Sequence, residues 1–387
     1  MHFRRVYLDN AASTPMDPVV RERVLQVMEL EGNPSSIHHH GRVLRAEIEQ
    51  ARKSIADQLG ASPAEIVFTS GGTEADNMAL LGAYNGLRVR TFISSPLEHH
   101  AVKHTLEWMR QTDPSVRVHW LTPDSVGHLD LQQLEGYLRQ ASGPTLVSLM
   151  QGNNEIGNLN DLKAIGQLCQ QYGAKLHSDM VQTIGLLAVD VRELPVDFIA
   201  ASAHKFYGPK GIGFLYRRDS AVVPPLIHGG GQERNQRAGT ENVAAICGMA
   251  LALERVSSQR ERIVTQLTEL KQAFRAQLEA DIPGVQFNGD TRPGHSLPTV
   301  LNVAFPGEGE ESLMLLNLDI RGISASGGSA CTSGAVTASH VLQALGHSGQ
   351  RIAHSVRFSF STFTTPDELD YTRGVLRDLL VPAGSVV

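Results

Sequence analysis

Short apolar runs and segments of helical spacing alternate along the first part of the chain. Seven runs have the length of buried strands, and they lie at 66–69, 91–94, 117–121, 146–149, 175–178, 196–201 and 213–216. Before the first run, apolar residues recur every three or four positions from Leu44 to Leu59 and stop at Gly60, which is typical of an amphipathic helix with a glycine cap. The alternation predicts an α/β fold with a mainly parallel sheet and helices on both of its faces.

The last third of the chain has a different order of elements. Apolar residues at spacings of three and four, from Ile263 to Leu278, predict a long helix that begins a new unit. Strands are expected near 299–303 and 355–360, and a final helical segment at 369–380. The pattern therefore predicts a second unit after the seven-stranded one.

Composition narrows the class of protein. A chain of 387 residues with 41% hydrophobic content is long enough for two domains and a large core. The sequence has no apolar stretch of about 20 residues and no signal-peptide core, so we expect a cytoplasmic protein without a membrane contact. A net charge of −6 gives no sign of the basic face that a nucleic-acid-binding protein presents.

The polar residues at the carboxyl ends of the predicted strands are candidates for a ligand-binding site, because parallel sheets bind ligands there. Lys205 follows the run at 196–201, where burial can lower the pKa of an amine until it forms Schiff bases, although a surface lysine also fits this segment. Asp179 is either a helix cap or a carboxylate that holds a protonated ring nitrogen. A glycine-containing turn at 70–77 lies at the start of a predicted helix. It either binds a phosphate through free backbone N–H groups or is an ordinary N-cap.

A lysine, an acidic partner for a pyridinium and a phosphate cradle are together what a pyridoxal phosphate site needs. The chain has no Gly-x-Gly-x-x-Gly after a strand and no Gly-x-x-x-x-Gly-Lys-Ser/Thr, which disfavours dinucleotide binding and nucleotide hydrolysis. Three adjacent histidines lie at 38–40, in a segment at 32–41 that has the composition of a loop. Consecutive loop residues rarely converge on one ion, so we expect no metal.

The three cysteines are too widely spaced for a disulfide framework or a metal knuckle, which fits a reducing compartment. Cys169 and Cys247 have apolar neighbours and are expected in the core. Cys331 lies in a loop at 324–334 that is rich in glycine, serine and alanine, so we expect it to be exposed and mobile. The alternative for Cys331 is a small residue in a flexible linker.

Ten motifs in order, from about residue 7 to residue 370, carry a resemblance to a known family. They include Leu-Asp-Asn-Ala-Ala near the start, Ser-Ala-His-Lys around Lys205 and Gly-Ser-Ala-Cys around Cys331. The full set lies at 7–12, 33–36, 69–74, 98–99, 153–157, 177–179, 202–205, 237–240, 328–331 and 355–359. With these motifs the chain resembles the cysteine desulfurases of the NifS/IscS group, in the class V aminotransferase family.

The resemblance implies a fold type I enzyme that depends on pyridoxal 5'-phosphate. Such an enzyme has a mainly parallel seven-stranded sheet in a large domain, here 15–255. The smaller α+β domain would combine 1–14 with 256–387 and carry a mobile cysteine loop at about 324–336. The implied assembly is a homodimer with its active sites at the subunit interface.

The resemblance also implies a role for each matched residue. Lys205 would hold the cofactor as a Schiff base, Asp179 would pair with its pyridine nitrogen, and His99 would stack on its ring. Arg357 would bind the substrate carboxylate through two parallel hydrogen bonds, assisted by Asn10. The other cofactor-binding residues would be Gly72, Thr73, Asn154, Gln182, Ser202, His204 and Thr240, of which Asn154 also faces the substrate and Thr240 reaches the partner's site.

The implied reaction converts L-cysteine to L-alanine. The amine of Lys205 would remove the Cα proton of the substrate, and the protonated ring beside Asp179 would take up the electrons. Cys331 as a thiolate would attack the substrate sulfur and become a persulfide, which is then delivered to a sulfur-acceptor protein. A mobile loop suits this task because the same sulfur is collected inside and released outside.

Two departures from the family pattern affect these expectations. Ser361 stands where family members often have arginine, beside the expected carboxylate site. The chain stops at Val387, without the longer C-terminal tail by which housekeeping iron–sulfur members dock their scaffold protein. We therefore expect a dedicated acceptor, and nitrogenase maturation, tRNA thiolation and DNA phosphorothioation all stay open.

Other functions remain open at this stage. A selenocysteine or cystine lyase of the same fold would use the same residues, whereas an aminotransferase has no need of Cys331. A non-catalytic sulfur-pathway interaction protein is the alternative of another class. The joint presence of Lys205, Asp179 and Cys331 argues against that alternative.

Overall fold

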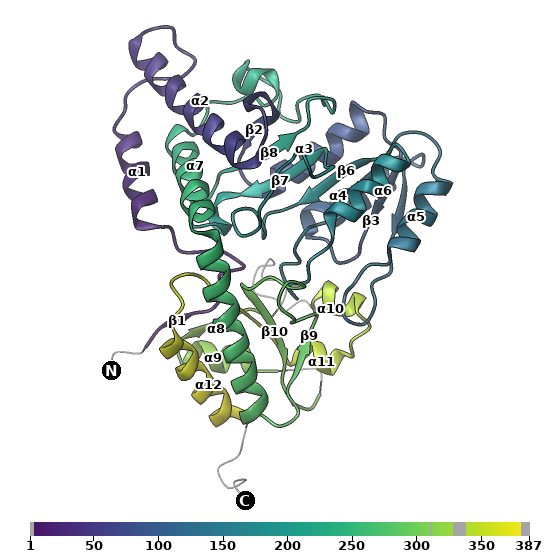
Figure 1. Ribbon diagram of the computed structural model, residues 1–387, viewed down its shortest axis with the longest axis vertical. Helices are drawn as coiled ribbons and strands as arrows, with labels where there is room; N and C mark the ends of the chain where they lie inside the picture. The colour runs from purple at the N-terminus through teal and green to yellow at the C-terminus, as the bar shows by residue number, and fades with distance from the viewer. Residues whose placement is uncertain (1–3, 310–311, 328–337, 381–387) are drawn as a thin grey trace, which may run out of the picture.

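The computed structural model describes residues 4–309, 312–327 and 338–380, and its largest sheet has seven strands (Figure 1). Their spatial order is β2 (Ile66–Thr69), β8 (Gly213–Arg217), β7 (Phe198–Ser202), β6 (Lys175–Asp179), β5 (Thr145–Ser148), β3 (Thr91–Ser94) and β4 (Arg117–Trp120). Strand β8 is antiparallel to both neighbours, and the other pairs are parallel. The α/β class and the seven predicted strands are therefore confirmed, with ends shifted by one or two residues.

Helices cover both faces of this sheet, which explains why its strands are continuous apolar runs. Successive side chains point to opposite faces: Val67 and Phe92 pack under one set of helices, and Phe68 and Ile93 under the other. The first set is α3 (Gly72–Asn85) and α4 (His100–Thr112). The second set is α2 (His39–Leu59), α5 (Leu131–Gln140), α6 (Leu162–Gln171) and α7 (Val243–Ser258).

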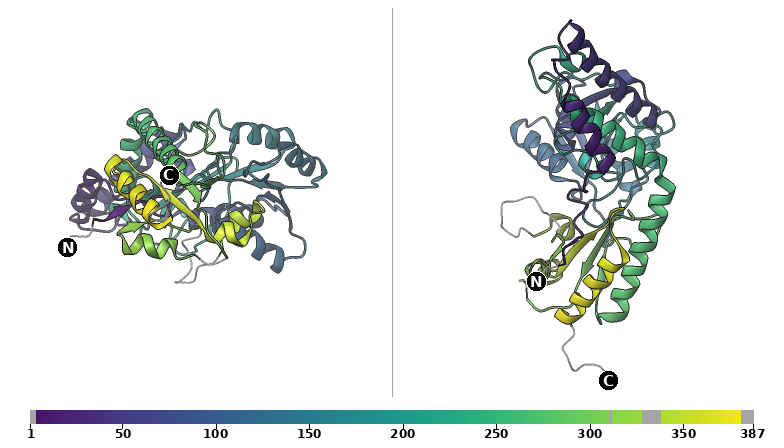
Figure 2. Two further views of the ribbon diagram at one scale, coloured as in Figure 1. Left: turned by 90° about the horizontal axis from the view of Figure 1, so that it is seen from below. Right: turned by 90° about the vertical axis from the view of Figure 1, so that its left-hand side faces the viewer.

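A smaller antiparallel sheet lies below the first in Figure 1 and in the right-hand view of Figure 2. Its strands are β12 (Ser355–Ser359), β10 (Val300–Ala304) and β9 (Gln286–Asn288). Helix α8 (Arg260–Asp281) runs along it, and Phe274 meets the edges of Phe358 and Phe360 with ring centroids 5.6 and 6.1 Å apart. The remaining elements there are α9 (Met314–Ile320), β11 (Ile323–Ser324), α10 (His340–Ala344), α11 (Gly349–Ala353) and α12 (Pro366–Leu380).

The N-terminal segment joins the two sheets. Strand β1 (Val6–Tyr7) pairs in parallel with β11, and the backbone N–H of Ser359 donates to the carbonyl of Leu8. The chain then crosses to α1 (Pro18–Met28), which packs against α7. Residues 4–9 thus lie with the C-terminal strands although they are furthest from them in sequence.

Local signals in the sequence account for both ends of α2. The Nδ1 atom of His38 accepts from the backbone N–H of Gly41, and the helix starts at His39, so the predicted loop at 32–41 is wrong over its last three residues. Gly60 ends the helix at φ 66°, a left-handed conformation that glycine adopts without strain. The predicted glycine cap is confirmed.

Two of the cysteines lie where the sequence predicted. Cys169 and Cys247 are in the core, 1% and 5% exposed, and burial raises the pKa of each thiol to about 12. Three short 3-10 turns, η1 (Pro63–Glu65), η2 (Ala203–Lys205) and η3 (Gln232–Asn235), complete the fold. Among the described residues, no helix combines the length and the apolar character needed to cross a membrane.

Candidate active site

A cavity of about 580 Å³ lies where β6 and β7 end and α3 and α4 begin. This is the place that the parallel-sheet rule predicts for a ligand. Ten of the residues proposed from the sequence line it: Gly72, Thr73, His99, Asn154, Asp179, Gln182, Ser202, His204, Lys205 and Arg357. Cys331, the proposed sulfur-accepting cysteine, lies outside the described residues.

Lys205 ends the short turn η2, directly after β7. Its Nζ donates to the backbone carbonyls of Ala11 and Ala12, the second at 3.0 Å. The same N-terminal turn is tied to the lysine turn, because the backbone N–H and the Oγ1 of Thr14 both donate to the carbonyl of His204. The amine is therefore half-buried and aimed across the cavity by a segment far away in sequence.

Asp179 closes β6 at the cavity floor and is 7% exposed. Its Oδ1 accepts from the backbone N–H of Val181 at 2.9 Å. Burial raises the pKa of Asp179 to about 6, against the lowering effects of this N–H and of the Lys205 ammonium. Above pH 6 the carboxylate is thus ionised and can hold a protonated ring nitrogen.

His99 is the N-cap of α4, and its Nδ1 accepts from the backbone N–H of Ala101 at 3.2 Å. The proton of the neutral ring therefore sits on Nε2. Burial, helped by the positive charge of Lys205, lowers the pKa of His99 to about 4. At neutral pH the site holds an uncharged imidazole that can stack on a cofactor ring.

The start of α3 forms the anion-binding end of the cavity. Gly71 is its N-cap, and no side chain of the described residues caps the helix, so backbone N–H groups and the helix dipole point at the cavity. A Cβ on Gly72 would lie 2.6 Å from Cγ2 of Val181, so any other residue there would force the Val181 side chain to move. The buried Nδ1 of His204 has no hydrogen-bond partner among the described residues.

These groups fit pyridoxal phosphate. Its phosphate matches the uncapped helix start together with the His204 imidazole, and its pyridine nitrogen matches the carboxylate of Asp179. The amine of Lys205 suits a Schiff base with its aldehyde.

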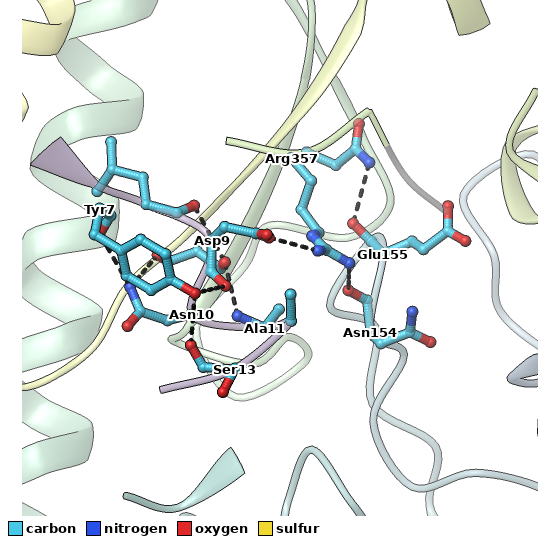
Figure 3. A network of polar contacts seen from close by, with 12 residues as sticks. Tyr7, Asp9, Asn10, Ala11, Ser13, Asn154, Glu155 and Arg357 are labelled. Atoms are coloured by element: carbon cyan, nitrogen blue, oxygen red, sulfur yellow. Dashed lines mark hydrogen bonds and ion pairs between the residues drawn. The ribbon is translucent and has the colours of Figure 1, made fainter. Parts of the chain in front are cut away.

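The opposite wall of the cavity is built around Arg357 (Figure 3). This side chain comes from β12 and is 2% exposed as a residue. Its Nη2 pairs with Oδ1 of Asp9 at 2.8 Å, and its Nη1 donates to the backbone carbonyl of Asn154 at 3.0 Å. A buried guanidinium held from two sides has a fixed fork, which is the geometry that a carboxylate ligand needs.

Two of the proposed residues do not line this cavity. The side-chain amide of Asn10 donates to the backbone carbonyls of Ser359 at 2.7 Å and Tyr7 at 3.2 Å. Thr240 is exposed and lines a separate cavity of about 140 Å³. Ser361, at the position of the family arginine, is buried in the turn after β12, where its Oγ accepts from the backbone N–H of Phe363.

Several residues of the site were missed from the sequence. Asp9 lies within a motif that was recognised, but its pairing with Arg357 spans 348 positions. Asp76 and Glu98 are each 1% exposed next to the cavity floor. Asp76 lies one helical turn after Gly72, so both residues are on the same face of α3. This spacing in the sequence could have indicated that Asp76 faces the site.

A family model for class-V aminotransferases matches residues 6–372. The chain belongs to the class-V aminotransferase family. A cysteine desulfurase IscS from Dictyoglomus turgidum is 42% identical to this chain over 380 residues, which cover 97% of this chain and 95% of the relative.

Solved structures of similar proteins agree with the family membership. A NifS-like protein has a TM-score of 0.89 and 34% identity, and the match covers 97% of this chain and 99% of that one. A structure of SspA in complex with cysteine has a TM-score of 0.79 and 33% identity over 93% of this chain and all 100% of that one. The chain thus has the α/β architecture of fold type I pyridoxal phosphate enzymes.

Proposed function

We propose that this member of the class-V aminotransferase family is a pyridoxal-phosphate-dependent cysteine desulfurase, which converts L-cysteine to L-alanine and transfers the sulfur to Cys331. The observation that carries this proposal is one cavity that brings Lys205, Asp179 and His99 opposite Arg357. Relatives named cysteine desulfurase match the chain over nearly its full length. A lysine and an arginine that face each other across a cofactor cradle suit an α-amino acid substrate.

The residues on the two sides of the cavity have different roles, with Lys205 and Asp179 on one side and Arg357 on the other. Pyridoxal phosphate, when bound, supplies an electron sink for the charge that develops at the substrate Cα. The amine of Lys205, aligned by two backbone carbonyls, takes the Cα proton. Arg357 binds the substrate carboxylate, and the ionised Asp179 holds the ring nitrogen in its protonated form.

Sulfur transfer needs a thiolate, and the three cysteines differ in how readily they ionise. Burial raises the pKa of Cys169 and of Cys247 to about 12, so neither forms a thiolate at neutral pH. We assign the acceptor role to Cys331. Its thiolate attacks the substrate sulfur, an S–S bond forms, and the C–S bond breaks with its electron pair going to the carbon that becomes the alanine methyl group.

The proposal is tested by an absorption spectrum of the purified protein before and after L-cysteine, with alanine and thiol-releasable sulfide quantified. We expect a visible cofactor band that changes on adding L-cysteine, and equal amounts of alanine and transferable sulfur. Cys331→Ala should lose alanine production from L-cysteine, whereas the matched Cys169→Ala variant should keep it. Full alanine production by Cys331→Ala would point to a lyase of the same fold.

The division into a large domain at 15–255 and a small domain formed by 1–14 and 256–387 is part of this proposal. It is supported by the sheets, because all seven strands of the first sheet come from 66–217 and the three strands of the second from 286–359. The N-terminal pairing of β1 with β11 and the boundary between α7 and α8 support the same division.

We further propose a cytoplasmic homodimer in which Thr240 reaches the partner's cofactor and a separate protein accepts the sulfur. Thr240 is exposed and away from its own cavity, and large apolar residues of the N-terminal region, such as Met28 and Ile37, are 68% and 89% exposed. Mixing Lys205→Ala chains with Thr240→Val chains tests this arrangement. If the site is shared, mixed dimers regain activity that neither variant has alone.

A further inference from the structure

A row of polar side chains interrupts the apolar layer between the large sheet and α3. This layer is filled by residues such as Met78, Leu146 and Phe198. Ser148 of β5 and His177 of β6 face the same layer, and Asp76 enters it from α3. All three are at most 1% exposed.

The three side chains form a chain of polar contacts that ends beside the cofactor carboxylate. The Oγ of Ser148 is hydrogen-bonded to Nδ1 of His177 at 2.8 Å, and Nε2 of His177 lies 3.3 Å from Oδ1 of Asp76, where neither of these two buried atoms has a hydrogen-bond partner among the described residues. Asp76 and Asp179 offer carboxylate oxygens within 4.8 Å of each other. Buried polar groups in such a row are expensive unless they share protons or hydrogen bonds.

The charges around Asp76 make a second anion there unfavourable. Burial and the neighbouring Asp179 and Glu98 carboxylates raise the pKa of Asp76 well above its usual value, and burial lowers the pKa of His177 to about 3. The other titratable groups that face this place are His99, which is neutral, and the Lys205 ammonium. Two carboxylates this close do not both ionise, so one proton is held among them.

We propose that Asp76 and His177 hold this proton between them, with the imidazole fixed by Ser148, so that Asp179 stays the deprotonated carboxylate of the site. All three are positioning residues, because they act through Asp179. The inference deepens the proposed function and rests on it, since Asp179 needs its charge for the ring nitrogen of pyridoxal phosphate. Without the imidazole, Asp76 and Asp179 would compete for the same proton.

The test measures the dissociation constant of pyridoxal phosphate from the full-length apoprotein between about pH 6 and pH 9. In His177→Leu, Asp179 takes part of the shared proton, so its effective pKa rises and its charge is lost as the pH falls. We expect binding about 10-fold weaker than wild type near pH 6.5, which corresponds to a shift of about one pKa unit. The difference should vanish towards pH 9, where the competing proton is gone.

A second substitution separates proton sharing from packing. The double variant Asp76→Asn/His177→Leu lacks the acid that competes with Asp179 for the shared proton and keeps only Glu98, which accepts from the backbone N–H of Met150, so the pH profile should return to within about 2-fold of wild type. A role in packing alone predicts that the double variant binds no better than the single one. Thr105→Val is the matched control, because it removes another buried hydroxyl that contacts α3, at Asn77, without touching the row.

Two gentler variants keep the test decisive if His177→Leu does not fold. Asp76→Asn alone should keep the wild-type profile, and Ser148→Ala should weaken binding about 2-fold to 3-fold at the low-pH end only. Two results would overturn this inference without affecting the proposed function. One is a Ser148→Ala variant that binds pyridoxal phosphate with the same pH profile as wild type. The other is a loss of affinity in Asp76→Asn that does not depend on pH. A wild-type protein that binds no pyridoxal phosphate at any pH would overturn the proposed function and the inference with it.

Discussion

The two walls of the cavity are built in different ways. The sheet wall consists of side chains that directly follow a strand or open the next helix, such as Asp179, Lys205 and Gly72. The arginine wall consists of Arg357, Asp9 and the Asn154 carbonyl, and it joins positions 348 and 203 apart in sequence. The sheet wall is built mainly from one sheet, with the N-terminal turn holding the Lys205 amine, whereas the arginine wall exists only when both sheets and the N-terminal segment have docked.

This difference indicates a division of labour. The sheet wall holds the groups that fit the cofactor, and its backbone is fixed by β6 and β7, two largely buried strands that pair in parallel. The arginine wall holds the group that fits the substrate, on a unit joined to the rest by α8 and the N-terminal segment. Damage to the sheet wall should therefore affect cofactor binding and turnover, and damage to the arginine wall should affect mainly substrate affinity.

The largest effect is expected for Lys205→Ala. In the proposed mechanism, removing the amine takes away both the cofactor attachment and the base for the Cα proton, so kcat should fall by a factor of about 10³ or more. Alanine formation from L-cysteine measures the loss. Lys163→Ala, at an exposed lysine of α6, is the control and should keep wild-type activity. Substantial turnover by Lys205→Ala would show that the reaction does not need the lysine of the sheet wall.

Arg357→Lys tests the arginine wall. A lysine keeps the charge but loses the two parallel donors and the pairing geometry with Asp9, so KM for L-cysteine should rise by about 10²-fold, from hydrogen bonds to charged groups worth about 1.5–3 kcal/mol. The dissociation constant of pyridoxal phosphate should stay within about 3-fold of wild type, because Arg357 belongs to the other wall. A loss of cofactor affinity instead would mean that the two walls are not separable.

Gly72→Ala tests how rigid the sheet wall is. The new Cβ would lie 2.6 Å from Cγ2 of Val181, and overpacking of this kind typically costs about 1–3 kcal/mol. We expect pyridoxal phosphate to bind about 10-fold more weakly, with partial recovery in Gly72→Ala/Val181→Ala. Gly136→Ala in α5 is the control, because a Cβ there meets no atom within 4 Å and should leave cofactor affinity unchanged. If Gly72→Ala binds pyridoxal phosphate as tightly as wild type, the side chains of this wall can shift at little cost.

The same contrast explains what the sequence could predict. Asp179, Lys205 and the turn at 70–77 were found because each follows an apolar run, and the position of a parallel strand fixes where its last residue lies. The pairing of Arg357 with Asp9 was not found, since no local pattern reports a contact between distant segments. Asp76 was missed for a related reason: on its helix it is an ordinary polar residue, and only the sheet buries it.

The joint between the two walls is expected to affect stability and its dependence on pH. Lys271 of α8 is 2% exposed, and its Nζ donates to Oγ of Ser296 at 2.7 Å and to the carbonyl of Leu297 at 2.8 Å. The backbone N–H of Leu297 in turn donates to the carbonyl of Gly157, in the segment that bears Asn154. Burial lowers the pKa of Lys271 to about 7, partly offset by the Asp290 carboxylate.

An unfolded lysine has a pKa of about 10.4, so between pH 7 and this value the unfolded chain binds more protons at Lys271 than the folded one. Stability contributed by this residue should therefore rise with pH, by at most about 1.4 kcal/mol per pH unit. Urea unfolding at pH 7, 8 and 9 measures the free energy of unfolding. We expect this free energy to rise with pH more steeply for the wild type than for Lys271→Met, and equally for the wild type and Lys163→Met. Parallel curves for wild type and Lys271→Met would mean that the amine stays charged at the joint.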